Sequence, residues 1–178
     1  MDTQRRIFSI AICSLLLAST SAARFAATDS NSSRLTQGGG EPEACTLLTT
    51  ADASKAIELS SAPGQRMVEA DPKGCLWSSS PAAMDTSRRV ALVLVSPRQF
   101  QIAMHPAITT IKVEPASGIG DEAFYQLYPN ASPFLWVRKG NKAVSLRIMT
   151  KVKPSPPFTV DQEKSKLAVL GKTVIAKL

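Results

Sequence analysis

Apolar and polar residues alternate in several stretches of the chain, and this alternation predicts β-strands. Residues 89–96 (RVALVLVS) predict the strongest strand without alternating, because their nearly continuous β-branched and aliphatic content suggests burial on both faces or a central strand under a helix. Residues 134–138 and 143–149 flank a Gly140-Asn141 pair and predict a hairpin, since Gly and Asn accept the positive φ of a tight turn. Shorter strands are predicted at residues 66–70, 74–80, 108–113 and 124–128.

Apolar residues three or four positions apart predict helices on either side of these strands. Thr49 and Asp52 have the spacing of a capping box, and residues 53–57 then place Ala, Ala and Ile on one helix face. Thr159 begins a similar pattern that predicts a terminal helix over residues 160–178. A third, short helix is predicted at residues 97–104, where Pro97 suits the first helical position.

The order of these elements favours the α+β class. Consecutive strands lie between an N-terminal and a C-terminal helix, which differs from the strand–helix alternation of a parallel sheet. We therefore expect an antiparallel sheet with the N- and C-terminal helices packed on one face, in a single domain of residues 44–178.

The N-terminal residues have the pattern of an export signal. Arg5 and Arg6 precede an apolar run over residues 7–18, and small residues near Ala23 suit cleavage there. Residues 1–23 are therefore interpreted as a signal peptide, with a retained membrane anchor as the alternative. Residues 24–43 are rich in Ser and Gly and are predicted to be a flexible linker. This organisation predicts a periplasmic or secreted protein whose membrane contact is at most peripheral.

Cys45 and Cys75 are the two cysteines outside the predicted leader. Two cysteines in an exported chain most simply form a disulfide, which here would close a loop of about 30 residues. Two free buried thiols and a redox pair are the alternatives, although a redox pair usually has the close C-x-x-C spacing.

Several of these motifs together resemble a known group of proteins. The run Cys45-Thr-Leu-Leu-Thr-Thr-Ala-Asp52, followed by a helix and then by Gly74-Cys75-Leu76-Trp77, is similar to small exported bacterial proteins and lipoproteins of unknown function. A Gly-Ile-Gly-Asp-Glu-Ala-Phe-Tyr segment at residues 118–125 fits the same pattern. The resemblance implies a two-layer α+β domain and no particular chemistry. No lipid-attachment motif is evident, so lipid anchoring is not implied.

The charge of the chain bears on its partners. The formal net charge of +7 and the isoelectric point of about 9.6 permit contact with anionic envelope polymers or lipid headgroups. Nucleic acid is not an expected partner, since the chain is predicted to be exported, has few aromatics and lacks a recognised binding motif. The hairpin and the residues after it are the candidate anion-binding region, and its basic residues are Arg138, Lys139, Lys142, Arg147, Lys151 and Lys153. The alternative is that these residues form a solvated edge that discourages strand-to-strand aggregation.

Candidate catalytic groups are sparse. Asp121, Glu122 and the single His105 could serve a small hydrolase only if folding brought them together around a pocket. Adjacent residues on a strand point to opposite faces, so Asp121 and Glu122 are not expected to share a metal ion. Gly118, Gly120 and Ala123 resemble a dinucleotide fingerprint, but a strand rather than a helix is predicted after them. We expect a tight turn there, in which Asp121 accepts hydrogen bonds from backbone amides, and no cofactor or metal.

These observations favour a non-enzymatic binding or envelope-associated domain. The predicted partner is an anionic envelope component, a small molecule or a protein. A small periplasmic hydrolase is the alternative, and convergence of Asp121, Glu122 and His105 would distinguish it.

Overall fold

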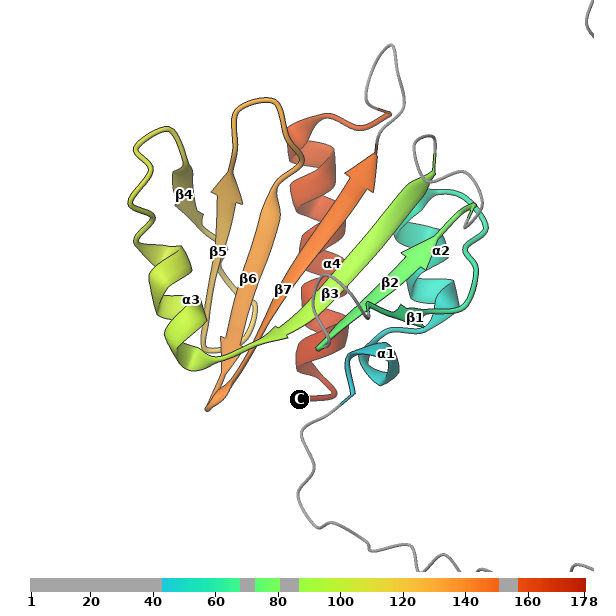
Figure 1. The fold of residues 1–178 in the computed structure, drawn as a ribbon, viewed down its shortest axis with the longest axis horizontal. Helices are drawn as coiled ribbons and strands as arrows, with labels where there is room; N and C mark the ends of the chain where they lie inside the picture. The colour runs from blue at the N-terminus through green and yellow to red at the C-terminus, as the bar shows by residue number, and fades with distance from the viewer. Residues whose placement is uncertain (1–42, 68–72, 81–86, 151–156) are drawn as a thin grey trace, which may run out of the picture. The chain divides into compact units, whose positions relative to one another are not determined.

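A computed structural model describes residues 43–67, 73–80, 87–150 and 157–178. The predicted signal peptide and nearly all of the predicted linker lie outside the described residues, as do Lys151 and Lys153. The described residues belong to one compact unit, residues 39–178, and form a seven-stranded antiparallel sheet in the order β1-β2-β3-β7-β6-β5-β4 (Figure 1). The strands are β1 (Gln65–Arg66), β2 (Gly74–Ser78), β3 (Arg88–Val95), β4 (Lys112–Pro115), β5 (Glu122–Leu127), β6 (Phe134–Lys139) and β7 (Lys142–Thr150).

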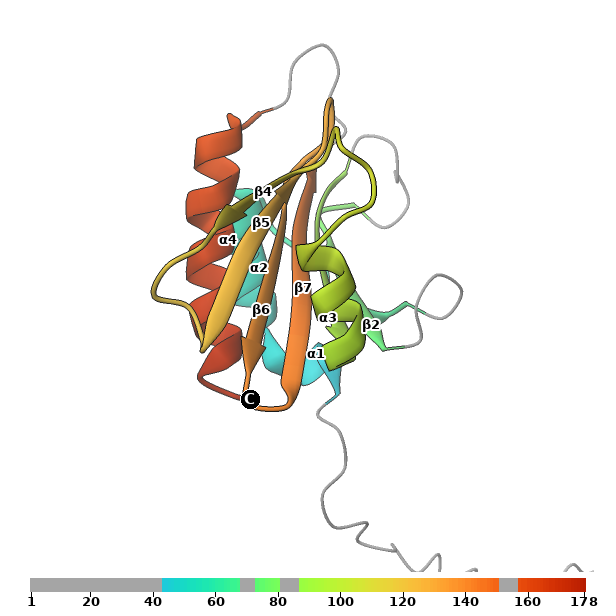
Figure 2. The ribbon, with the colours of Figure 1, turned by 90° about the vertical axis from the view of Figure 1, so that its left-hand side faces the viewer.

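Three helices pack on one face of this sheet, which we call the first face (Figure 2). They are α1 (Ala44–Leu47), α2 (Thr50–Ile57) and α4 (Val160–Ile175). The core between these helices and the sheet is apolar. Every second side chain of β3 and β7 points into it, and these side chains are all Val, Leu or Ile in the middle of the two strands. Its largest members with less than 2% of their surface exposed include Trp77, Leu92, Leu135, Leu146 and Leu167. The predicted packing of the N- and C-terminal helices on one face of an antiparallel sheet is confirmed.

The remaining described helix, α3 (Pro97–Met104), lies on the opposite or second face (Figure 2). Phe100 is fully buried there and meets Phe124 of β5 edge to face, with ring centroids 5.1 Å apart. The helix contacts β5, β6 and β7 and covers one end of the second face. The sequence predicted this helix but not the face on which it packs.

All three longer helices begin with a capping box, as the sequence indicated for α2. The Thr49 hydroxyl accepts from the Asp52 amide at 3.1 Å, and the Asp52 carboxylate accepts from the Thr49 amide at 2.9 Å. Ser96 begins α3 and Thr159 begins α4 in the same reciprocal way, with Gln at the third helical position of each. Each cap satisfies backbone amides that have no partner inside the helix.

In two places the structure differs from the sequence-based expectation. The strand predicted at residues 108–113 begins only at Lys112, because Ile108 to Ile111 forms a turn in which the Ile111 amide donates to the Ile108 carbonyl. The short helix α1 was not predicted, because its four residues are too few to show a helical period. Leu47 and Leu48, which precede the α2 cap, are buried in the core.

The β6–β7 hairpin is confirmed, with Lys139 paired to Lys142 across a two-residue turn. Gly140 has a φ of 58° in this turn, a conformation that residues with a side chain adopt less readily. Gly120 also has a positive φ and packs so closely that a Cβ there would lie 2.5 Å from the Arg138 carbonyl oxygen. The adjacent β5 and β6 therefore meet closely at the end of the sheet where the hairpin turns.

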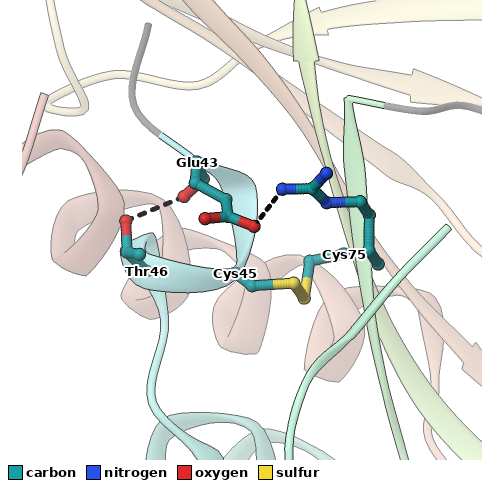
Figure 3. The surroundings of a disulfide bond; sticks show 5 residues. Glu43, Cys45, Thr46 and Cys75 are labelled. Atoms are coloured by element: carbon teal, nitrogen blue, oxygen red, sulfur yellow. Dashed lines mark hydrogen bonds and ion pairs between the residues drawn. A yellow bond between two sulfur atoms is a disulfide. The ribbon is translucent and has the colours of Figure 1, made fainter. Parts of the chain in front are cut away.

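Cys45 and Cys75 form a disulfide that joins α1 to β2 (Figure 3), so the predicted pairing is confirmed. Beside it, Arg66 of β1 pairs with Glu43, and the Thr46 hydroxyl donates to the Glu43 carbonyl at 2.8 Å. The disulfide links the start of the domain to the strand that carries the buried Trp77.

Candidate anion-binding site on the second sheet face

The pleat of β7 divides its side chains between the two faces of the sheet. Val144, Leu146 and Ile148 enter the core of the first face, and the residues between them point to the second face. Ser145 and Arg147 therefore lie on the second face, on β7, which pairs with β3 on one side and β6 on the other. Arg147 is the one described residue of the candidate basic set that sits in the middle of the sheet.

Arg147 is held over an aromatic ring. Its register partner on β6 is Phe134, and the guanidinium carbon lies 4.5 Å from the centre of that ring. The Tyr128 ring lies beside Phe134, with centroids 5.5 Å apart. A guanidinium on an aromatic face is attracted by the ring quadrupole and keeps its fork of donors free for another partner.

No described carboxylate pairs directly with Arg147, and its buried Nε donates no hydrogen bond within the described part of the chain. Burial lowers the pKa of Arg147 below its ordinary value, and Arg89 lowers it further. Glu163 and Tyr128 raise the same pKa, and each has a larger effect on it than Arg89. Arginine stays protonated near neutral pH, so the site carries a half-buried positive charge that no described carboxylate contacts.

A buried glutamine positions the aromatic neighbours of Arg147. Gln126 of β5 is 3% exposed, and its side-chain amide donates to the Ala103 carbonyl of α3 at 2.5 Å. Its carbonyl oxygen accepts from the Trp136 indole at 2.9 Å and from the Tyr128 hydroxyl at 3.2 Å. These bonds tie α3, β5 and β6 together and fix the side of the site next to Phe134.

On its other side, Arg147 adjoins a set of second-face residues on β2 and β3. Ala91 lies directly opposite Arg147 on β3, and Leu76 lies opposite Ala91 on β2. One step along the strands in either direction, Val93 pairs with Ser145 and Arg89 pairs with Met149. We call this set the β2–β3–β7 patch, and its members are Leu76, Arg89, Ala91, Val93, Ser145, Arg147 and Met149.

The other described basic residues of the candidate region have partners within the fold. Arg138 lies on the second face but forms an ion pair with Glu122, with Nη2 and Oε2 3.0 Å apart. Lys139 and Lys142 reach the C-terminal end of α4, where their ammonium groups donate to the carbonyls of Ile175 at 2.8 Å and Leu178 at 3.0 Å. Cations at this end of a helix offset the partial negative charge of its carbonyls. These three residues and Arg147 therefore do not form one continuous patch.

The three candidate catalytic residues do not converge. The Asp121 carboxylate accepts from the Gly140 amide at 2.6 Å, so its backbone partner lies in the β6–β7 turn rather than in the turn before β5, and Glu122 pairs with Arg138. His105 is exposed at the C-terminal end of α3, near the Ala103 carbonyl that Gln126 binds. This places His105 at the Gln126 end of β5. Gln126 is four residues from Glu122 along β5, a span of about 13 Å at the usual rise of a strand, so His105 and Glu122 lie toward different ends of that strand.

Glu163 is a buried acid in the first turn of α4. Its side chain is covered on the first face, leaving the residue 4% exposed, and it accepts from the Ser132 hydroxyl at 3.0 Å and the Thr150 hydroxyl at 3.4 Å. Burial raises the pKa of Glu163, while the two hydroxyls and Arg147 lower it by a smaller amount. The sequence offered no signal for this burial, because acidic residues are common at helix starts.

The sequence also missed Gln126 and Phe134 as parts of the site. One usable signal was present, since Phe134 and Trp136 alternate with the core residues Leu135 and Val137 and so had to face the other way. Trp77 is 1% exposed and belongs to the first-face core. Trp136 is half-buried and stacks on Phe124, with centroids 6.1 Å apart.

No protein-family model, curated protein or solved structure matches this chain. Among the described residues, no helix is long and apolar enough to cross a membrane. In the same residues, no three His, Cys, Asp or Glu side chains gather as a metal-binding group. The geometry around Arg147 is therefore the main structural guide to function.

Proposed function

We propose that the chain is an exported, non-enzymatic binding domain of the bacterial envelope, located in the periplasm or secreted. The observation that supports binding is Arg147, a half-buried guanidinium over Phe134 that contacts no described carboxylate. Leaving a charge partly desolvated and unpaired costs stability, so such a group is better explained by a ligand than by the fold. Of the six basic residues considered from the sequence, Arg147 is the one we propose as the anion-binding residue.

Export is supported by the leader pattern in residues 1–23 and by the Cys45–Cys75 disulfide, which suits an oxidising compartment. Protein recovered from its native envelope or medium should begin near Arg24 and should contain no free thiol at Cys45 or Cys75. Full-length, reduced protein confined to the cytosol would contradict this part of the proposal.

Binding can be tested on protein purified from its own envelope without denaturation. Native mass spectrometry should detect a bound anionic component in the wild-type protein, which should be lost or much reduced in Arg147→Gln. Arg138→Gln is the matched control, because Arg138 lies on the same face but already pairs with Glu122. An adduct that survives in both variants, or no adduct from any envelope preparation, would argue against a binding role for Arg147.

The alternative of a small periplasmic hydrolase would require Asp121, Glu122 or His105 to act at one centre. Asp121 and Glu122 are engaged near the hairpin turn, and His105 is exposed at the end of α3. Hydrolysis of ester, amide or glycosidic model substrates that disappears in Glu122→Gln or His105→Ala would favour the enzyme.

A further inference from the structure

The neighbours of Arg147 indicate what kind of anion the second face would take. The β2–β3–β7 patch contains apolar or small residues on nearly every side of the guanidinium, with Ala91 directly opposite and Leu76 beyond it. Leu76, Val93 and Met149 are each half-buried, although they point away from the first-face core. Among the described helices, only α3 packs on this face, and its contacts lie with Phe124, Ala143 and Trp136 rather than with these residues.

The polar groups of the patch are few. Ser145 is 8% exposed and lies between Val93 and Trp136, and it is the one hydroxyl that borders Arg147 along β7. Arg89 lies diagonally from Arg147 on the same face and acts on its pKa as a like charge. A peptide or a sugar would need many hydrogen-bonding partners here, whereas a ligand with one anionic group and an apolar body would not.

We infer that the β2–β3–β7 patch binds a single anionic amphiphile, of the chemical class of a long-chain carboxylate. This inference rests on the proposed binding function and names its ligand class. The carboxylate accepts two hydrogen bonds from the Arg147 guanidinium, which is oriented by the Phe134 ring. The alkyl chain runs across Ala91 toward Leu76 and Val93 and covers their half-buried side chains.

The test is calorimetric titration of the folded protein with hexanoate, octanoate, decanoate and dodecanoate, each below its micellar concentration. Affinity should rise along the series by up to about fourfold for each buried methylene. Arg147→Gln should weaken dodecanoate binding on the order of ten- to a hundredfold, because a charge-assisted hydrogen-bond pair is lost. Arg138→Gln, on the same face but paired with Glu122, should bind as the wild type does.

A second variant tests the site even if Arg147→Gln is poorly folded. Val93→Glu places a carboxylate diagonally from Arg147 on the neighbouring strand, within reach of a long side chain. It should pair with Arg147, retain the fold and abolish dodecanoate binding. Dodecanoate binding that is unchanged in Val93→Glu or in folded Arg147→Gln would overturn the inference.

Three further probes separate the ligand class from other anions. Dodecanol should bind much more weakly than dodecanoate, and acetate should not bind measurably. Equal affinity for acetate and dodecanoate would overturn the inference that the ligand is an amphiphile, while leaving an anion-binding function in place. Arg147-dependent retention on phosphatidylglycerol vesicles without binding of monomeric dodecanoate would also overturn it, since the partner would then be a membrane surface. Absence of dodecanoate binding, together with an Arg147-dependent adduct on the native protein, would reject this ligand class but not the proposed function.

Discussion

The two faces of the sheet differ in the partners of their described cationic side chains. Cations that reach the first face have partners in the fold: Lys164 pairs with Glu114 and Lys166 with Glu58, both at 2.6 Å, and Arg88 donates to the Ile57 carbonyl at 2.9 Å. On the second face, Arg138 is paired with Glu122, but Arg147 contacts an aromatic ring and no described carboxylate. These described cations of the first face join helices to strands or to other helices, whereas Arg147 on the second face has no described carboxylate partner.

The same contrast applies to apolar side chains. Leu146 is 0% exposed between the sheet and the helices of the first face. Leu76 points to the second face and remains half-buried, in a region that α3 does not contact. A fold stabilised mainly by its first face can leave part of the second face for recognition, and the following experiments test that division.

The largest expected effect comes from removing the same side chain on each face. Leu146→Ala should lower the free energy of unfolding by about 2–5 kcal/mol, because it leaves a cavity in the buried first-face core. Leu76→Ala should cost less than half as much, since its side chain is partly exposed already. Urea unfolding at equilibrium measures both, and equal losses would show that the second face is also a closed core.

The disulfide belongs to the first-face architecture. Replacing Cys45 and Cys75 by Ser should lower the free energy of unfolding by about 3–4 kcal/mol, because the unfolded chain regains the freedom of a loop with a separation of 30 residues. Ligand affinity at Arg147 should be unchanged where the variant remains folded. A change in affinity without a change in stability would mean that the two faces are coupled.

Glu163 should respond to pH in the opposite sense from an ordinary surface acid. Its folded-state pKa is raised by burial, so the protonated form is favoured by folding, and stability is lost as pH rises through the raised pKa. Glu163→Gln keeps acceptors for Ser132 and Thr150 and should stabilise the protein at pH 7. This gain in stability should vanish below the ordinary pKa of 4.5, where the Glu163 carboxyl of the wild type is protonated in both the folded and the unfolded state.

Asp161→Asn is the matched control for Glu163, since Asp161 is exposed in the same first turn of α4. It should be neutral or slightly destabilising at pH 7, because it removes a favourable charge at the helix start. Urea unfolding at pH 7 and pH 4 gives both comparisons. A destabilising effect of Glu163→Gln at pH 7 would show that its ionised form stabilises the fold, through Arg147 for example.

The smallest effects are expected at the helix caps. Thr49→Ala in α2 and Ser96→Ala in α3 should each cost about 1 kcal/mol of unfolding free energy, as loss of an N-cap usually does. Hydrogen exchange should locate the first loss at the start of α2 and the second at the start of α3. If Ser96→Ala also weakened ligand binding, then α3 would help to shape the second-face site through Gln126.

The sequence by itself determined the elements and much of their arrangement. The nearly continuous apolar content of residues 89–96 identified one central strand, and the turn at Gly140 identified the hairpin whose second arm, residues 143–149, is the other. Thr49 with Asp52 identified a helix start. These predictions held because they depend on local periodicity and on turn and cap chemistry, which act within a few residues. Alternation along the two arms of the hairpin placed Arg138 and Arg147 on the face opposite the core.

Only the tertiary structure decided which of the described basic residues have a hydrogen-bond or ion-pair partner within the fold. Arg138, Lys139 and Lys142 look equivalent to Arg147 in the sequence, yet each finds a partner that lies at least 16 residues away along the chain. The burial of Glu163 by Ser132 and Thr150 and the packing of α3 through Gln126 likewise depend on distant segments meeting. Whether a charge is paired is a property of the assembled sheet and helices, and local sequence pattern does not contain it.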